Sequence, residues 1–135
     1  QIGQDRIDAF ADVTDDHQFI HVDPAAAAQT PFGTTIAHGF LSLSMLSAFA
    51  YDALPAIANR TMGVNYGFDR IRFLTPVPSN ARLRARFTLR ECEAKTATDW
   101  VTRYAVTVDI EGQSRPALVA DWITMAKISP DPAAT

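Results

Sequence analysis

The sequence has little cysteine and no excess of positive charge, and both shortages exclude classes of protein. Cys92 is the single cysteine among 135 residues, so no internal disulfide can form, which suits a reducing cytoplasm. We expect Cys92 to be a buried small apolar residue rather than a nucleophile. The formal net charge of −3 provides no basic surface, so nucleic acid is not an expected partner.

The sequence also lacks an uninterrupted apolar run long enough for a membrane. The most apolar stretch, residues 35–54, contains His38, three serines and Asp52, and these polar groups argue against a transmembrane helix. No signal peptide is visible, so a cytoplasmic location is expected. The chain starts at Gln1 without a methionine, so we expect a trimmed start, which leaves open a first strand before it.

The first part of the chain has the pattern of helices. Hydrophobic residues make up 47% of the chain, which is typical of a folded globule. Residues 2–14 have the spacing of a short amphipathic helix. Asp23 and Pro24 predict a second helix start, as N-cap and first helical residue. After the break at residues 31–33, residues 35–54 are apolar on nearly every side, which predicts a helix enclosed by other structure.

The second part of the chain alternates apolar and polar residues, as strands with one wet face do. Together with the apolar helix, this pattern predicts an α+β domain with an antiparallel sheet wrapped around that helix. We assign residues 1–129 to this single domain and expect residues 130–135 to be a disordered tail. The expected strands are residues 63–73, 81–91, 98–110 and 116–127. In the second strand Ala81, Leu83, Ala85, Phe87 and Leu89 share one face, and Arg82, Arg84, Arg86 and Arg90 share the other.

A first candidate site lies in the segment DDHQFIHVDP, residues 15–24. Asp16 and His21 are five residues apart, and a turn between them would let both hold one water for general acid–base catalysis. Two other interpretations are open. Asp15 and Asp16 can be turn or cap residues beside a satisfied polar His21. His17, His21 and Asp23 can instead supply metal ligands, although they match no recognised ligand frame.

A second candidate site is TTIAHGF, residues 34–40, where the apolar helix begins. First-turn N–H groups are unsatisfied and carry partial positive charge. The N–H of Gly39 can therefore stabilise an oxygen that gains negative charge. Alternatively, Gly39 only permits close packing against the sheet. Ser47 lies two turns further along and is either a packing residue or a residue that reaches the site.

These segments, with NYGFDRIRFLTPVPSNARLRAR at residues 65–86, resemble the MaoC-like family of (R)-specific enoyl-CoA hydratases. The resemblance extends from about Ile2 to Met125 and is strongest for the NodN-like branch. It implies a hot-dog fold, in which an antiparallel sheet wraps around a long central helix. It also implies an enzyme that adds water to a trans-2-enoyl thioester, giving a (3R)-hydroxyacyl thioester, in a reversible reaction without metal, flavin or nicotinamide.

The resemblance assigns roles to single residues. Asp16 matches the catalytic aspartate, and His21 matches the catalytic histidine. Gly39 matches the glycine whose N–H holds the thioester oxygen. We group Ser47 and His38 with Gly39 as substrate-binding residues. The family also implies a homodimer whose two sheets join edge to edge, in agreement with the tendency of exposed strand edges to pair.

The sequence departs from the family pattern at two places. Asp15 stands where a glycine commonly precedes the aspartate, and Gln18-Phe19 replaces an Asn-Pro found in several members. We choose Asp16 rather than Asp15 because only Asp16 keeps the family spacing to His21. A hot-dog acyl-CoA thioesterase and a non-catalytic acyl-thioester-binding module remain alternatives. The substrate carrier is either CoA or acyl-carrier protein, and the arginine face of the second strand either contacts CoA phosphates or is merely solvated.

Overall fold

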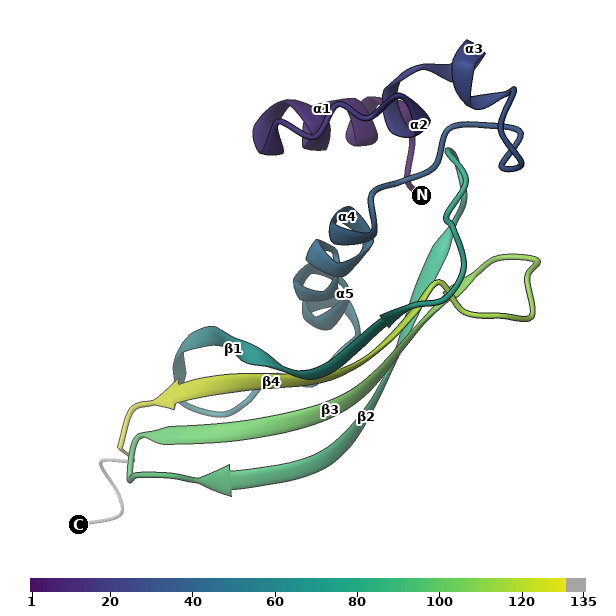
Figure 1. Cartoon of the computed structure of the whole chain (residues 1–135). Helices are drawn as coiled ribbons and strands as arrows, with labels where there is room; N and C mark the ends of the chain where they lie inside the picture. The colour runs from purple at the N-terminus through teal and green to yellow at the C-terminus, as the bar shows by residue number, and fades with distance from the viewer. Residues whose placement is uncertain (131–135) are drawn as a thin grey trace.

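The computed structural model describes residues 1–130 and has the α+β architecture of the hot-dog fold. Three helices at the start of the chain form a group beyond one end of a long curved sheet (Figure 1). Two further helices stand on the concave face of that sheet (Figure 1). The helices are α1 (Gln4–Thr14), α2 (Phe19–Val22), α3 (Pro24–Ala27), α4 (Gly39–Ser44) and α5 (Leu46–Ala53), and the strands are β1 (Arg60–Phe73), β2 (Leu83–Ala94), β3 (Asp99–Ile110) and β4 (Leu118–Ile128).

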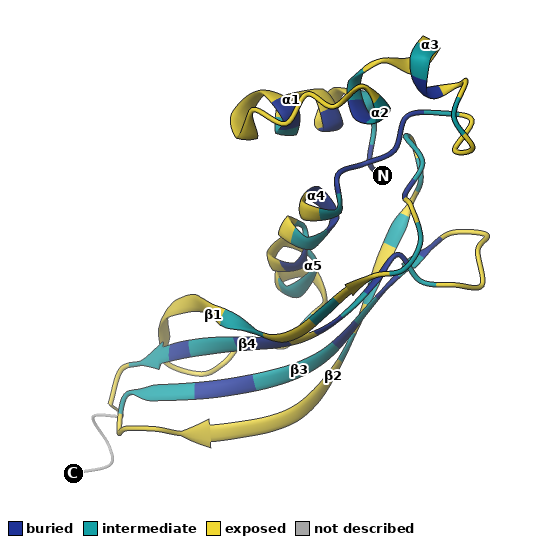
Figure 2. Ribbon diagram, viewed as in Figure 1, coloured by how far each residue is buried: buried dark blue, intermediate teal, exposed yellow. Residues whose placement is uncertain are grey.

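The four strands form one antiparallel sheet in the order β1-β4-β3-β2. β3 and β4 lie in the middle and carry most of the buried strand residues, whereas much of β1 and the outer half of β2 are exposed (Figure 2). All four expected strands are present, with each end within three residues of its expected position. Within the described chain, β1 and β2 each have one edge without a partner strand.

The predicted alternation along the second strand is confirmed for most of its length. Leu83, Ala85 and Phe87 pack against the core, while Arg82, Arg84 and Arg86 are exposed. Arg86 pairs with Asp109 at 2.7 Å, so part of the arginine face is neutralised on the surface. Leu89 departs from the prediction, since it is 54% exposed. Leu89 still pairs in the register of Leu83 and Phe87, because the register shifts only after it. It is exposed because it lies in the outer half of this edge strand, where every residue from Thr88 on is exposed.

The core lies where the helix pair meets the sheet. Leu41 and Leu46 pack with Val106, Leu118 and Trp122 from β3 and β4, all at most 4% exposed. Truncating such a buried leucine to alanine typically costs about 2–5 kcal/mol of stability. The first helix joins the same core through Ile7, and Ala11 is also fully buried.

The prediction of one helix over residues 35–54, enclosed on all sides, is wrong in two respects. Met45 divides it into α4 and α5. The helix pair is also buried on one side only, since Phe40 is 68% exposed and Tyr51 is 79% exposed. A curved sheet of four strands covers one face of a helix, and nothing within the described chain covers the opposite face (Figure 2).

Three smaller expectations have different outcomes. Asp23 is the N-cap of α3, where its carboxylate accepts the Ala26 N–H at 3.0 Å, and Pro24 is the first helical residue, as expected. Cys92 is exposed rather than buried, because it lies in the outer half of the edge strand β2. The expected tail lies, from residue 131 on, outside the described residues. None of the described helices is long and apolar enough to cross a membrane.

Candidate active site

Asp16 lies in a sharp turn that follows the first helix. Helix α1 ends at Thr14, and Asp15 adopts the left-handed conformation with φ 60° and ψ 20°. The chain then reverses, and the Asp16 carboxylate accepts the Gln18 N–H at 3.3 Å. Left-handed backbone favours glycine, although aspartate tolerates it. This conformation explains why a glycine suits the position that Asp15 occupies.

His21 lies in the short helix α2 with its ring in a defined tautomer. The ring is 7% exposed, and its Nδ1 lies 2.7 Å from the carbonyl oxygen of Ile36. A carbonyl only accepts hydrogen bonds, so Nδ1 carries the proton and Nε2 of the neutral ring keeps a lone pair. Burial lowers the pKa of His21 below its ordinary value, and the neighbouring His38 lowers it further. The ring is therefore neutral at pH 7, with Nε2 able to accept a proton.

His38, directly before α4, connects Asp16 and His21. Its Nε2 donates to the backbone carbonyl of Asp16 at 3.0 Å. Its ring stacks on that of His21, with centroids 3.8 Å apart and an interplanar angle of 24°, and Phe10 covers another side. His38 is 2% exposed, and its Nδ1 has no hydrogen-bond partner among the described residues. This histidine fixes the Asp16 loop beside the His21 ring.

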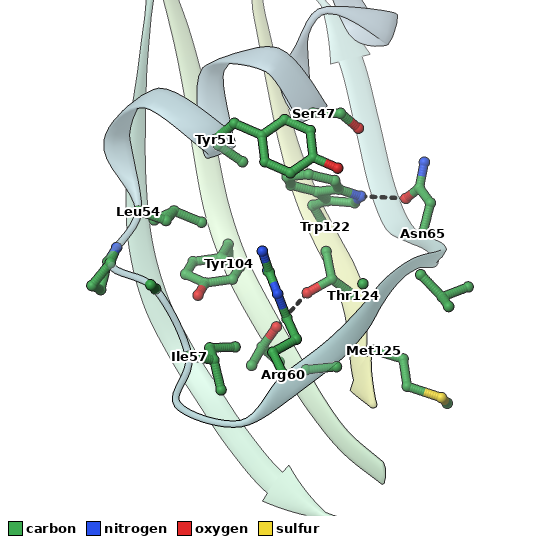
Figure 3. A pocket seen from close by; sticks show the side chains of 17 residues that line it. Ser47, Tyr51, Leu54, Ile57, Arg60, Asn65, Tyr104, Trp122, Thr124 and Met125 are labelled. Carbon is green, nitrogen blue, oxygen red and sulfur yellow. Dashed lines mark hydrogen bonds between the residues drawn. The ribbon is translucent and has the colours of Figure 1, made fainter. Parts of the chain in front are cut away.

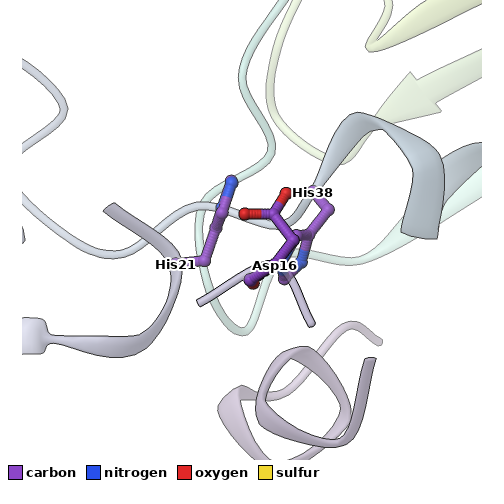
Figure 4. Close-up of side chains that lie close together, drawn as sticks. All are labelled: Asp16, His21 and His38. Carbon is purple, nitrogen blue, oxygen red and sulfur yellow. The ribbon is translucent and has the colours of Figure 1, made fainter. Parts of the chain in front are cut away.

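Asp16, His21 and His38 thus form one cluster from three separate segments (Figure 4). One side-chain oxygen or nitrogen from each lies within 4.8 Å of the others. Since Asp16 is exposed while both histidines are buried, the cluster has one open side. The arrangement brings together a carboxylate and a neutral imidazole at a place that solvent or a substrate can reach.

The alternative metal set of His17, His21 and Asp23 is wrong. His17 turns away and bonds Asp12 at 2.9 Å, and the Asp23 carboxylate caps α3. Within residues 1–130 the one group with metal-ligand spacing is Asp16, His21 and His38. Its two rings stack nearly face to face, so their in-plane lone pairs do not converge as a tetrahedral ion requires.

Gly39 borders the same cavity as His21. This cavity of about 370 Å³ is otherwise lined mostly by apolar residues of the loops that follow β1 and precede β4. As the first residue of α4, Gly39 has an N–H without an intrahelical acceptor. A Cβ added there would lie 3.1 Å from the Phe73 ring. Glycine therefore also permits close packing, and both interpretations of this residue have a structural basis.

Ser47 does not line the His21 cavity. It is exposed and borders a separate hollow of about 120 Å³, together with Leu43 of α4 and Trp122 of β4. Ser42 is the residue that sequence reasoning missed. It lines the cavity of His21 and Gly39, is 2% exposed, and its Oγ has no partner among the described residues. The sequence could have indicated Ser42, because it lies three residues after Gly39 and residues with that spacing share a helix face.

Comparison with known proteins shows the family to which this fold belongs. Residues 1–110 match the MaoC like domain family. Nodulation protein N of Rhizobium leguminosarum bv. viciae is 54% identical over 131 residues, covering 96% of this chain and 81% of that protein. The 3-hydroxyacyl-thioester dehydratase Z of Mycobacterium tuberculosis is 41% identical over 122 residues, covering 90% and 80%.

Solved structures of related proteins have the same fold. The R-hydratase PhaJ1 from Pseudomonas aeruginosa superposes with a TM-score of 0.79 at 27% identity, covering 95% of this chain and 76% of that one. The fold and the relatives define a dehydratase- or hydratase-type hot-dog domain. The chain belongs to the MaoC-like family, and Nodulation protein N is a near relative within it.

Proposed function

We propose that the protein catalyses the reversible, (R)-specific hydration of trans-2-enoyl thioesters with Asp16 and His21 as its catalytic dyad. The observation that carries this proposal is the geometry of His21. Its Nδ1–H is held by the Ile36 carbonyl at 2.7 Å, so Nε2 is the ring nitrogen that can accept, and a ring nitrogen of His21 lies within 4.8 Å of an Asp16 carboxylate oxygen. Two acceptors side by side can orient one water, because each takes one of its O–H groups.

The chemistry follows from that orientation. The thioester carbonyl binds at the Gly39 N–H, which withdraws electrons and makes C3 of the enoyl group electrophilic. Asp16 takes a proton from the water while His21 orients it, and the oxygen forms a bond to C3. The C2=C3 double bond opens toward C2, which receives the proton through the dyad. One water is consumed, and the product is a (3R)-hydroxyacyl thioester.

The names of the relatives support the substrate class but leave the carrier open. The mycobacterial relative is a 3-hydroxyacyl-thioester dehydratase, which runs the same reaction in the opposite direction. An (R)-specific enoyl-CoA hydratase of Aeromonas caviae is 34% identical over 68 residues, half of this chain. We extend to this chain an acyl-CoA or acyl-carrier-protein thioester as substrate, with no cofactor.

We further propose that the working form is a homodimer in the cytoplasm. The unpaired edges of β1 and β2 and the exposed outer face of the helix pair, with Phe40 and Tyr51, both favour association. The lone cysteine, Cys92, suits a reducing compartment.

Incubation with crotonyl-CoA tests the proposed reaction. Loss of the conjugated chromophore, with formation of (3R)-hydroxybutyryl-CoA on a chiral column, is the expected result. Release of free CoA thiol without that product would favour a thioesterase. Binding of the enoyl-CoA with an unchanged chromophore, at every chain length tried, would favour the non-catalytic acyl-binding module and overturn the proposal.

A further inference from the structure

A further pocket lies at the far end of α5 (Figure 3), and it shares no lining residue with the His21 cavity. It has a volume of about 200 Å³, room for about six groups of the size of a water molecule. The side chains of α5 and of the following loop cover it on one side, and the concave faces of β1, β3 and β4 form its floor. Its lining is partly apolar, with Leu54, Ile57 and Trp122, and partly polar.

Arg60 gives this pocket a positive charge. Its guanidinium extends into the pocket between Tyr104 and Thr124 (Figure 3). Among the described residues no carboxylate forms an ion pair with Arg60, and none lines the pocket. By contrast, Arg103 and Lys127, on the neighbouring strands, each pair with an acidic residue. An arginine without a partner beside an apolar wall is suited to a carboxylate.

The other polar groups of the pocket divide into those already bonded and those still available. The indole N–H of Trp122 donates to the Asn65 side-chain oxygen at 2.6 Å, and the hydroxyls of Thr102 and Thr124 bond each other. The hydroxyl of Tyr104 lies beside Thr102, and burial raises its pKa, so that it stays protonated and can donate. The pocket thus offers a cation and a neutral donor for one anionic group.

We propose that this pocket binds the carboxylate at the far end of an acyl chain, with Arg60 as the residue that selects it. The substrates would then include enoyl thioesters that carry a terminal carboxyl group. This part of the inference rests on the proposed function, in which the thioester end lies at Gly39. Ser47 is eight residues further along the chain, in α5, and it lines both this pocket and the hollow beside Leu43.

Binding of simple probes tests the pocket without any catalysis. Titration calorimetry compares octanoate with 1-octanol, which has the same chain without the charge. We expect octanoate to bind the wild-type protein and Arg60→Gln to weaken it by about tenfold or more, as the loss of a charge-assisted hydrogen bond does. Arg70→Gln is the matched control, because Arg70 is exposed on the same strand and does not line the pocket.

Equal affinity of the wild-type protein for octanoate and octanol, or unchanged octanoate affinity in Arg60→Gln, would overturn the inference. Melting temperatures of both variants show whether a loss reflects unfolding instead. Tyr104→Phe supplies a second variant, which removes only a hydroxyl and should weaken octanoate binding less than Arg60→Gln does.

Activity assays then connect the pocket to the substrate. We compare trans-2-octenoyl-CoA with the same thioester carrying a terminal carboxyl group. Arg60→Gln is expected to lower kcat/KM for the carboxylated substrate about tenfold and to leave crotonyl-CoA unaffected. Equal effects on both eight-carbon substrates would overturn the selection of a carboxylate. Arg60-dependent octanoate binding without hydration of any thioester would instead refute the proposed function and leave the pocket assignment standing.

Discussion

The rings of His21 and His38 stack with their centroids 3.8 Å apart, and each ring holds a different backbone carbonyl. His21 binds the carbonyl of Ile36 through Nδ1, and His38 binds that of Asp16 through Nε2. The stack therefore joins the Asp16 loop, helix α2 and the start of α4. Because both rings are buried, two positive charges in the stack would be costly.

Loss of either dyad residue is expected to remove most hydratase activity. Asp16→Asn and His21→Ala each abolish a proton-transfer group, an effect commonly worth about 10²- to 10⁴-fold in rate. Turnover of crotonyl-CoA measures the loss, and circular dichroism shows whether the fold is kept. Asp15→Asn is the matched control and should retain activity. Inactive Asp15→Asn together with active Asp16→Asn would show that the assignment is one residue too far along the chain.

Replacement of His38 is expected to impair positioning rather than binding. His38→Leu removes the donor to the Asp16 carbonyl and should lower kcat by up to about 10²-fold, with little change in KM. His38→Gln restores an N–H donor and should recover part of the loss. Since His38 contributes to the low pKa of His21, both variants should move the acid limb of the kcat/KM profile to higher pH. Equal damage in both variants, with an unshifted limb, would indicate a packing role alone.

His21 should also make stability depend on pH. Its pKa in the folded protein is lowered, mainly by burial, from the ordinary value of 6.5. The unfolded chain therefore binds the proton more readily, and stability falls as pH drops from above 6.5 toward the folded-state pKa. Denaturant unfolding at a series of pH values measures this slope, which His21→Gln should reduce.

His17 is the matched control for that experiment. It is exposed, and its hydrogen bond to Asp12 raises its pKa. Its contribution has the opposite sign, being present at low pH and lost as pH rises through the folded-state value. His17→Gln should therefore leave the dependence of stability on acidic pH unchanged or make it steeper. An unchanged slope in His21→Gln would contradict the prediction.

Ser47→Phe is expected to shorten the range of accepted acyl chains. Ser47 borders the hollow beside Trp122, and a phenyl ring there would occupy space that a long acyl chain needs. We expect kcat/KM to fall about tenfold more for trans-2-decenoyl-CoA than for crotonyl-CoA. Ala48→Phe, at the exposed neighbouring position, is the control. Equal loss at all chain lengths, with a large fall in melting temperature, would show that Ser47 has a packing role and does not limit chain length.

Light scattering at micromolar concentration is expected to give twice the mass of one chain. The reason is the pair of unpartnered strand edges at β1 and β2. Val64→Lys places a charge at an exposed apolar position on β1, and Leu89→Lys does the same on β2. If the two chains join through β1, Val64→Lys should shift the mass toward one chain, and if they join through β2, Leu89→Lys should do so. A fully active wild-type monomer would refute the dimer.

The sequence by itself determined the features that depend on local pattern. The four strands follow from period-two alternation, because the pleat sends neighbouring side chains to opposite faces. The α3 cap follows from Asp23 and Pro24, whose preferences are local. The family motif also led to the hypothesis that Asp16, His21 and Gly39 act together, since a motif is read along the chain, and their catalytic roles stay predictions.

Tertiary structure alone decided the features that depend on what lies opposite a residue. The exposure of Cys92, Phe40 and Tyr51 follows from where the sheet ends, and periodicity carries no information about that. Separation of Ser47 from the His21 cavity depends on the packing of two helices against the sheet. The tautomer of His21 is set by the carbonyl of Ile36, fifteen residues away. Such contacts arise when separate segments pack together, because burial and hydrogen bonding depend on proximity in space rather than along the chain.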